Sequence, residues 1–254
     1  MINHEIDYQK YFDSKYCNRN YRQKIKCQDL TSFQVQEEES DLLIQSSAFI
    51  NDKALSLLKY YRKILKDYIY LHPSFKTTLR PYPSDKSSHS MILDMIMASQ
   101  QCNVGPMASV AGCISQYVGR NLLRYSNDII IENGGDLFIK STRIRRVMIY
   151  AGSSPLSNKF YLEVDSSEKS IGICTSSGTV GPSLSMGKAD AVTVLSCSAI
   201  VADAAATAVG NIIQNKNDIP KGLDFAKSIP DILGLIIIKD DKIGIWGEIQ
   251  YGLV

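Results

Sequence analysis

A long apolar stretch rich in small residues, AVTVLSCSAIVADAAATAVGNII (191–213), constrains the fold of this chain more than any other segment. It is long enough to span a bilayer, but Asp203 lies near its middle, and alanine, serine and threonine outnumber leucine and phenylalanine. An acidic side chain at bilayer depth is costly. We therefore predict a buried strand followed by a small-residue helix, and we expect no membrane partner.

The composition is that of a globular protein. Of the 254 residues, 44% are hydrophobic and 21% are charged, with a formal net charge of +2. This even balance argues against a nucleic-acid partner. The first ten residues, MINHEIDYQK, have no apolar signal-peptide core, so we expect a cytoplasmic protein with reduced thiols. The six cysteines and three histidines are not paired at ligand spacing, and we expect neither zinc nor haem.

The residue patterns predict an α+β fold with one domain (31–254) after a polar N-terminal arm (1–30). Alternation predicts a hairpin over 31–46, and helical spacing predicts helices over 51–72, 91–101, 107–123 and 199–213. The β-rich segments 146–152, 159–164, 169–177 and 189–195 are expected to be central strands of mixed sheets covered by helices. The aromatic residues of the arm are expected to pack on a neighbouring subunit of a homo-oligomer; they are Tyr8, Tyr11, Phe12, Tyr16 and Tyr21.

A small-residue helix followed by a strand–turn–strand segment occurs twice in the chain. The first copy, within 104–141, contains YVGRNLL and IIIENGGDLFI, and the second, within 198–249, contains AVGNII and LIIIKDDKIGIW. This predicts an internal duplication with two pseudo-repeated halves. Chance similarity between short isoleucine-rich segments is the alternative.

The densest group of chemically useful side chains is the segment GICTSSGTVG (172–181). Its glycines allow close approach to a ligand, and its amides and hydroxyls can form an anion-binding nest, so we expect ligand contacts from Thr175, Ser176, Ser177, Gly178 and Thr179. The alternative is a tight loop that caps its own backbone. The following glycines do not match a Walker A loop, because five residues separate Gly181 from Gly187 and Ala189 replaces the required serine or threonine.

Cys174, in the same segment, is a weak candidate for a catalytic nucleophile. No histidine lies near it in the sequence, so only the fold could bring a base to its thiol. Packing is the alternative role for this side chain.

The turn residues Asn133, Gly134, Gly135 and Asp136 are a second candidate site. Between two strands, this sequence is typical of a hairpin turn. Contact with a ligand is the second interpretation.

Asp203 and Thr207 are the third candidate site. Four residues apart on a helix, they lie on one face, among alanines that offer no hydrogen-bond partner. A hard cation such as Mg²⁺ takes oxygen ligands and would satisfy both side chains. The alternative is that Asp203 caps a neighbouring loop and Thr207 bonds the carbonyl one turn back.

Taken together, several motifs resemble those of an uncharacterised ApbE-like family, bacterial and archaeal relatives of the FAD-dependent flavin transferases. The motifs are VGPMASVAG (104–112), YVGRNLL (117–123), IIIENGGDLFIKS (129–141), YAGSSPLS (150–157), GICTSSGTVG (172–181), SLSMGKADAVTV (183–194), SAIVADAAATAVGN (198–211) and IGIWGEI (243–249). The resemblance covers about nine-tenths of the chain. It implies an ApbE-like α+β fold with repeated halves.

The resemblance also implies site residues. In the transferases, Mg²⁺ is held by an aspartate, a threonine four residues on and a backbone carbonyl, which correspond here to Asp203, Thr207 and a carbonyl near Ala111. Their GGD turn matches Gly134, Gly135 and Asp136, and their serine segment beside the flavin matches Cys174 to Gly178. Within the first motif, we expect Gly105, Pro106 and Met107 to contact the cofactor.

Two departures from the transferases argue against flavin transfer by this chain. Only about 20 residues separate Gly178 from Ala199, without the histidine of the longer transferase segment, and Gly112 replaces the transferase lysine. We therefore expect a phosphate-bearing ligand, of the nucleotide or flavin (FAD or FMN) type, to bind with Mg²⁺. The alternatives are an accessory role in anaerobic sulfur assimilation from sulfide to homocysteine, implied by the resemblance, or a scaffold with a degenerate site.

Overall fold

The computed structural model describes residues 22, 27–84, 88–180 and 185–254. The aromatic residues expected to mediate oligomerisation, Tyr8 to Tyr21, lie outside these residues. The described helices are α2 (Asn51–Leu71), α3 (Ser74–Thr77), α4 (Ser90–Cys102), α5 (Val110–Leu122), α6 (Ala199–Ile212) and α7 (Ile219–Ala226), with the short 3₁₀ helices η2 (Pro106–Ser109) and η3 (Lys216–Asp218). The described strands are β1 (Thr31–Glu37), β2 (Ser40–Ser46), β3 (Ile129–Asn133), β4 (Asp136–Lys140), β5 (Arg145–Met148), β6 (Phe160–Val164), β7 (Ile171–Ser176), β8 (Ala191–Ser196), β9 (Ile232–Lys239), β10 (Lys242–Gly247) and β11 (Gln250–Leu253).

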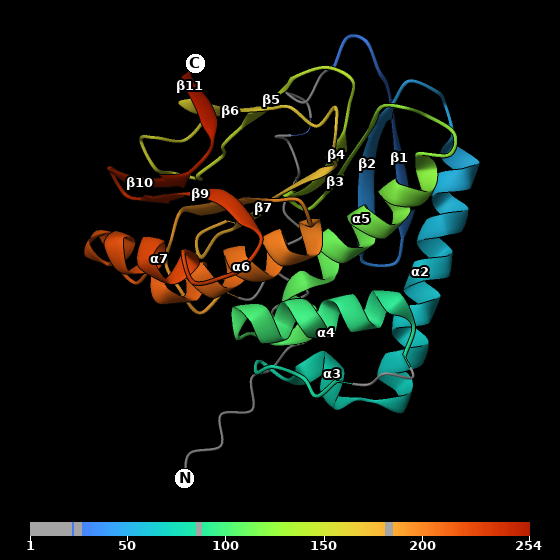
Figure 1. Ribbon diagram of the computed structural model, residues 1–254, viewed down its shortest axis with the longest axis horizontal. Coiled ribbons are helices and arrows are strands. Elements are labelled where there is room, and N and C mark those ends of the chain that lie inside the picture. The colour runs from blue at the N-terminus through green and yellow to red at the C-terminus, as the bar shows by residue number, and fades with distance from the viewer. Residues whose placement is uncertain (1–21, 23–26, 85–87, 181–184) are drawn as a thin grey trace.

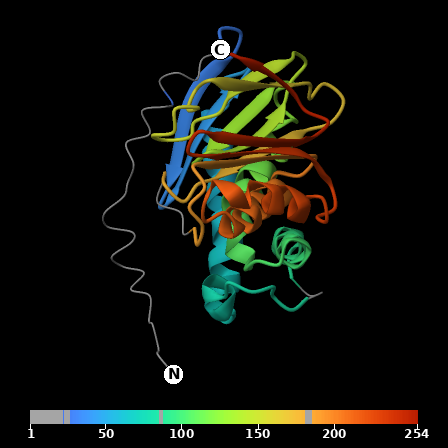
Figure 2. The same cartoon turned by 90° about the vertical axis from the view of Figure 1, so that its left-hand side faces the viewer.

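An eight-stranded sheet in the order β1-β2-β3-β4-β7-β8-β9-β10 forms the middle layer. The helices pack on one face of this sheet, and a three-stranded sheet in the order β11-β6-β5 covers part of the other face (Figure 1). Figure 2 shows the same arrangement from the side, with the helices below the sheets. This is an α+β fold, as predicted. Every strand pair in the described residues is antiparallel, which corrects the expectation of mixed sheets.

The alternation of side chains along the central strands divides the core into two. In β3, Ile129 and Ile131 face the helices, whereas Ile130 faces the three-stranded sheet. In β7, Cys174 faces the helices and Ile173 faces the other way. Successive residues of a strand point to opposite faces, so a central strand buried on both sides is apolar throughout.

The predicted hairpin over 31–46 and the predicted helices are present. In α2, the buried residues Ala54, Leu58, Tyr61, Leu65 and Tyr68 recur at helical spacing, so one face of the helix lies on the core. The expectation for the central strands was right for β7 and β8. It was wrong for β5, an edge strand of the three-stranded sheet, whereas β6 is the middle strand of that smaller sheet. Short β-rich segments do not reveal which sheet they join, because that depends on distant partners.

Both small-residue helices predicted from the sequence are present, and they pack against each other. A Cβ atom at Gly112 of α5 would lie 2.2 Å from the carbonyl oxygen of Ala199 in α6. The absence of a side chain at Gly112 therefore allows the two backbones to approach closely. Each helix is followed later in the chain by an antiparallel hairpin, β3–β4 and β9–β10, but α7 intervenes in the second case. The internal duplication stays a prediction.

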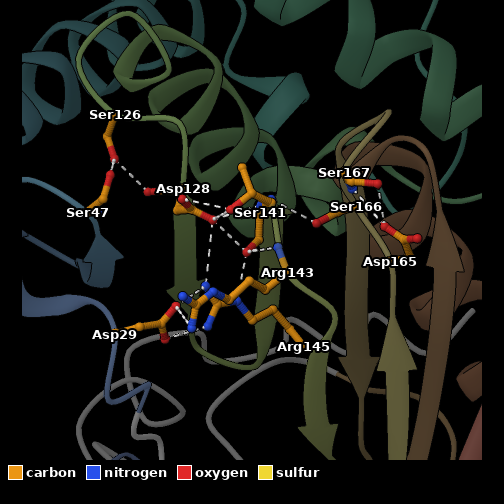
Figure 3. A network of polar contacts seen from close by, with 11 residues as sticks. Asp29, Ser47, Ser126, Asp128, Ser141, Arg143, Arg145, Asp165, Ser166 and Ser167 are labelled. Atoms are coloured by element: carbon orange, nitrogen blue, oxygen red, sulfur yellow. Dashed lines mark hydrogen bonds and ion pairs between the residues drawn. The ribbon is translucent and has the colours of Figure 1, made fainter.

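A buried arginine of the three-stranded sheet, Arg145, takes part in a polar network with residues next to the eight-stranded sheet (Figure 3). Arg145, at the start of β5, donates two hydrogen bonds to the carboxylate of Asp29, at 2.8 and 2.9 Å, and lies 3.6 Å from Asp128. The carboxylate of Asp128 also accepts hydrogen bonds from Ser141 and Thr142. This network joins the segment before β1, the start of β3 and the β4–β5 connection. Within the residues described, no helix is both long and apolar enough to cross a membrane.

Candidate functional site

The three candidate sites of the sequence meet where β4, β7, α5 and α6 come together. Asp136 is the first residue of β4, and its Cα is paired with that of Cys174 in β7. Phe138, two residues further along β4, lies in the helix-side core, so Asp136 also faces the helices. The turn residues and the GICTSSGTVG segment are therefore adjacent, next to the small-residue helices.

Asp203 is buried in the middle of α6, with 9% of its surface exposed. Its Oδ2 accepts a hydrogen bond from the backbone N–H of Gly112 at 2.8 Å, and the N–H of Ala111 also stabilises the carboxylate. These amides belong to the first turn of α5, where N–H groups have no partner within the helix. Asp203 thus caps a neighbouring backbone segment, one of the two roles considered for it.

Asp136 and Asp203 are close enough to influence each other's ionisation. Burial raises the pKa of Asp203 from 3.8 to about 7, although the hydrogen bonds from Gly112 and Ala111 lower it. Burial, and then the charge of Asp203, hold the pKa of Asp136 well above its ordinary value. Neither carboxylate forms an ion pair with a basic side chain in the part of the chain that the structure describes. Positive charge near this pair would favour ionisation of both.

Two further residues of the predicted cation site, Thr207 and Ala111, come from the same two helices as the contacts of Asp203. Thr207, one helical turn further along α6, is partly exposed, as is Ala111. The carbonyl of Ala111, in the first turn of α5, accepts a hydrogen bond from the side-chain amide of Asn133 at 3.1 Å. No group of three or more His, Cys, Asp and Glu side chains that could hold a metal occurs among the described residues. A cation here would therefore depend on hydroxyl and carbonyl oxygens as well as carboxylate.

The predicted loop residues divide between different surroundings. Ser176 faces α6, since a Cβ atom at Gly210 would lie 3.3 Å from its hydroxyl. Thr175 points away from the helices and forms a hydrogen bond with Thr193 at 2.9 Å between their hydroxyl oxygens. Of these residues, Ser176 lies against α6, beside Gly210.

The end of this loop satisfies its own backbone. The hydroxyl of Ser177 accepts hydrogen bonds from the N–H groups of Thr179 and Val180 at 3.1 and 3.0 Å. Thr179 donates its hydroxyl proton to Asp190 at 3.1 Å. Gly178 is exposed, and its Cβ position is taken by the backbone of Gly187. The hydrogen bonds of Ser177 and Thr179 are those expected of a loop that caps its own backbone, the alternative to ligand contact.

The three residues expected from the first motif precede α5. Gly105 is buried where a Cβ atom would lie 1.9 Å from the carbonyl oxygen of Thr78. Pro106 is buried and begins η2, whereas Met107 is partly exposed. Only Met107 among the three has side-chain surface to offer a ligand, and the contacts of Gly105 explain why a glycine stands there.

Comparison with known proteins decides the family. A family model described as "AbpE bacteria" matches residues 22–223. The chain belongs to this AbpE family. Its relatives include UPF0280 proteins of Methanosarcina barkeri, 35% identical over 219 residues (85% of this chain and 86% of the relative), and of Methanococcus maripaludis strain S2, 42% identical over 190 residues (73% and 77%).

Solved structures show the same fold for this AbpE protein. The apo flavinyl transferase ApbE of Pseudomonas stutzeri matches with a TM-score of 0.57 at 12% identity, covering 85% of this chain and 94% of that chain. The ApbE protein of Thermotoga maritima matches with a TM-score of 0.55 at 12% identity, covering 86% and 97%. The predicted ApbE-like fold is therefore confirmed.

Cys174 of the AbpE protein is a buried thiol. Its Sγ lies 3.3 Å from the carbonyl oxygen of Ala199, and it forms a hydrogen bond with Asp136. Burial is the main reason why the pKa of Cys174 lies well above its ordinary value of 9.0, and the negative charge of Asp136 is the second. Because the thiolate is the nucleophilic form, this environment disfavours the reactive form of Cys174.

Sequence reasoning missed two residues of the AbpE protein that bear on the turn. Glu132, directly before Asn133, is buried and accepts a hydrogen bond from the N–H of Gly135 at 2.9 Å. Arg22 donates from its Nε to Glu132 at 2.5 Å. The sequence does contain a signal for Glu132: an acidic residue directly before an Asn-Gly-Gly turn can accept a hydrogen bond from a turn amide. No local signal pointed to Arg22, which lies 110 residues from Glu132 in the sequence.

Proposed function

We propose that this AbpE-family protein binds a small phosphate-bearing ligand, of the nucleotide or flavin type, together with a divalent cation. Asp203, Thr207 and the backbone carbonyl of Ala111 would hold the cation. One observation carries the proposal: Asp136 and Asp203 are both buried, both have raised pKa values, and neither is paired with a basic side chain among the described residues.

Two neighbouring buried carboxylates are unfavourable when both are ionised. Either protons or a cation must compensate for their charge. Mg²⁺ is a small, hard ion that uses carboxylate, hydroxyl and carbonyl oxygens and keeps several waters or substrate oxygens. Asp203, Thr207 and Ala111 supply these donor types from α6 and the start of α5, so the residues present fit such an ion.

The partly exposed residues near Asp203 support a ligand with acidic oxygens. Gly135 lies in a turn where it and Gly134 have positive φ angles of 108° and 69°, and Ser176 and Thr207 are partly exposed residues with hydroxyl side chains. Hydroxyl groups can donate hydrogen bonds to phosphate oxygens. When bound, the cation would neutralise phosphate charge. The protein's own residues would orient the ligand between the β3–β4 turn and α6.

Isothermal titration calorimetry with FAD, FMN and nucleoside diphosphates, each with and without Mg²⁺, tests the proposal. We expect binding that requires Mg²⁺ and that is lost in Asp203→Asn. Asp224→Asn is the matched control, because Asp224 is an exposed carboxylate of α7 that pairs with Lys227. No binding of any of these ligands at millimolar concentration, or equal binding by Asp203→Asn and wild type, would overturn the proposal.

The accessory role in sulfur assimilation remains a separate hypothesis that rests on the family resemblance. Its candidate residue, Cys174, is buried with a raised pKa, so the structure gives this hypothesis no reactive thiol there. Growth of a deletion strain with sulfide as its sulfur source would separate the two: a specific growth defect without ligand binding by the pure protein favours the accessory role.

A further inference from the structure

Arg22 is connected to the β3–β4 turn through the side chain of Glu132. Its guanidinium donates from Nε to Glu132 Oε2 at 2.5 Å and from Nη1 to both carboxylate oxygens of Asp41 at 2.9 Å. Its Nη2 donates to the backbone carbonyl of Asp41 at 2.8 Å. The side chains of Arg22, Asp41 and Glu132 are 11%, 17% and 4% exposed, so this is a largely buried ionic cluster. The two carboxylates of the cluster come from neighbouring strands, Asp41 from β2 and Glu132 from β3.

The other oxygen of Glu132 acts on the turn itself. Oε1 accepts the N–H of Gly135 at 2.9 Å, so a single carboxylate connects the arginine to the backbone that precedes Asp136. Gly134 and Gly135 are the central residues of the turn, and their positive φ angles are those of a tight hairpin. A two-glycine turn has many accessible conformations when it is not restrained. The hydrogen bond from Gly135 to a charged acceptor is therefore a specific restraint on it.

Asn133 restrains the same turn from the opposite face of the sheet. Its side-chain amide donates to the carbonyl of Ala111 at 3.1 Å, at the start of α5. Because Glu132 and Asn133 are consecutive in β3, their side chains point to opposite faces. The turn is thus held on one side by α5 and on the other by the Arg22–Glu132 pair.

We infer that Arg22 and Glu132 are positioning residues, which fix the Gly134–Gly135 turn and thereby place Asp136 for the ligand. Arg22 neutralises Glu132 and holds its carboxylate in the orientation that accepts the N–H of Gly135. Arg22 is by this means coupled to the candidate site. The part of this inference that concerns ligand binding rests on the proposed function; the part that concerns the turn does not.

Amide hydrogen exchange of Gly135, measured by NMR on the full chain, tests the turn directly. We expect exchange of Gly135 in Arg22→Gln to be about tenfold faster than in wild type. Without Arg22, the Glu132 carboxylate is no longer held in the orientation that accepts the N–H of Gly135, so this hydrogen bond is weakened. Glu132→Gln should show a similar acceleration. The double variant should show little more than either single variant, since both act through one hydrogen bond. Arg22→Lys, which keeps the charge, should recover part of the protection.

Arg145→Gln is the matched control. Arg145 is an equally buried arginine, with a 9% exposed side chain, and it makes a two-point ion pair with Asp29 away from the turn (Figure 3). Its loss should reduce stability and leave the exchange of Gly135 unchanged. Unchanged exchange in both Arg22→Gln and Glu132→Gln, or an equal acceleration in Arg145→Gln, would overturn the inference. If Arg22→Gln does not fold, Arg22→Lys and Glu132→Gln decide the question.

Titration with Mg²⁺ and the ligand that wild type binds gives the second measurement. We expect weaker binding in Arg22→Gln and Glu132→Gln, and wild-type affinity in Arg145→Gln. If wild type binds none of the ligands, the proposed function fails, while the exchange measurement still decides whether Arg22 positions the turn. Ligand binding that is unaffected by a measured loosening of the turn would overturn the functional part of the inference alone.

Discussion

The carboxylate of Asp203 and the backbone N–H of Gly112 form a 2.8 Å hydrogen bond between two residues that are 91 positions apart. It joins the middle of α6 to the first turn of α5, at the point where Gly112 lies against the backbone of Ala199. The close packing of the two small-residue helices and the placement of the buried acid are therefore one structural feature. A change to either should alter the other.

The raised pKa of Asp203 predicts that stability falls as the pH rises. Asp203 ionises near 3.8 in an unfolded chain and near 7 in the folded protein. Between these pH values the folded state binds more protons, so the free energy of unfolding decreases with increasing pH and levels off above about pH 7. Each unit of pKa difference corresponds to about 1.4 kcal/mol. Urea unfolding from about pH 5 to about pH 8 measures this slope.

Asp203→Asn should make the pH dependence shallower, although Asp136 remains and keeps part of it. Asp224→Asn, on an exposed face of α7, should leave the slope as in wild type. Adding Mg²⁺ should raise the Tm of wild type more at about pH 8 than at about pH 5, because the cation replaces bound protons. An unchanged slope in Asp203→Asn would show that this carboxylate does not titrate in the range given.

Gly112→Ala should destabilise the protein. The new Cβ atom would lie 2.2 Å from the carbonyl oxygen of Ala199 and 2.9 Å from Cβ of Asp203, so the helices must move apart. Overpacking of this kind costs about 1–3 kcal/mol. Gly210→Ala in α6 is the control, since its Cβ atom would come no closer than 3.3 Å, to the hydroxyl of Ser176, which can rotate. Urea denaturation should show a loss for Gly112→Ala and little change for Gly210→Ala.

The elements of this fold follow from patterns that are local in the sequence. The helical spacing of Ala54, Leu58, Tyr61 and Leu65 predicts α2, and the alternation over 31–46 predicts the β1–β2 hairpin, because both depend on neighbouring residues. The assignment of β5 and β6 to a second sheet was not predictable in this way. The second partner of β6, β11, is at the C-terminal end of the chain, so this pairing is a matter of long-range packing.

The sequence alone was enough to name the residues of the candidate site, but it did not reveal most of the contacts between them. Four-residue spacing places Asp203 and Thr207 on one face of a helix, but it does not reveal that the first turn of α5 donates to Asp203. Alternation along β7 separates Thr175 from Ser176, although both stood in one motif. Arg22 was not predictable, since only the folded chain brings it to Glu132.

Asp190 should be important for the loop that follows β7. Its buried carboxylate accepts the hydroxyl proton of Thr179 at 3.1 Å and the N–H of Asp240 at 2.6 Å, so it joins this loop to the β9–β10 turn. Asp190→Asn weakens both bonds and should lower the free energy of unfolding by about 1–3 kcal/mol.

Asp165→Asn is the comparison for this change. Asp165 is an exposed carboxylate that accepts hydrogen bonds from the backbone and hydroxyl of Ser167, and its loss should cost less than about 0.5 kcal/mol. Urea denaturation gives both values, and hydrogen exchange should show faster exchange over residues 178–180 in Asp190→Asn alone. Equal losses in the two variants would contradict the role assigned to Asp190.

Thiol labelling should distinguish Cys174 from Cys197. Cys174 is buried with a pKa well above 9.0, whereas Cys197 is exposed at the β8–α6 junction. Alkylation requires an accessible thiolate, so iodoacetamide at neutral pH should modify Cys197 in the native protein and leave Cys174 unmodified. In concentrated urea, both should react, as peptide mass spectrometry would show. Cys197→Ser should remove the fast native reaction without exposing Cys174. Native labelling of Cys174 at a rate similar to that of Cys197 would mean that α6 separates from β7 in solution, and it would restore Cys174 as a candidate for sulfur chemistry.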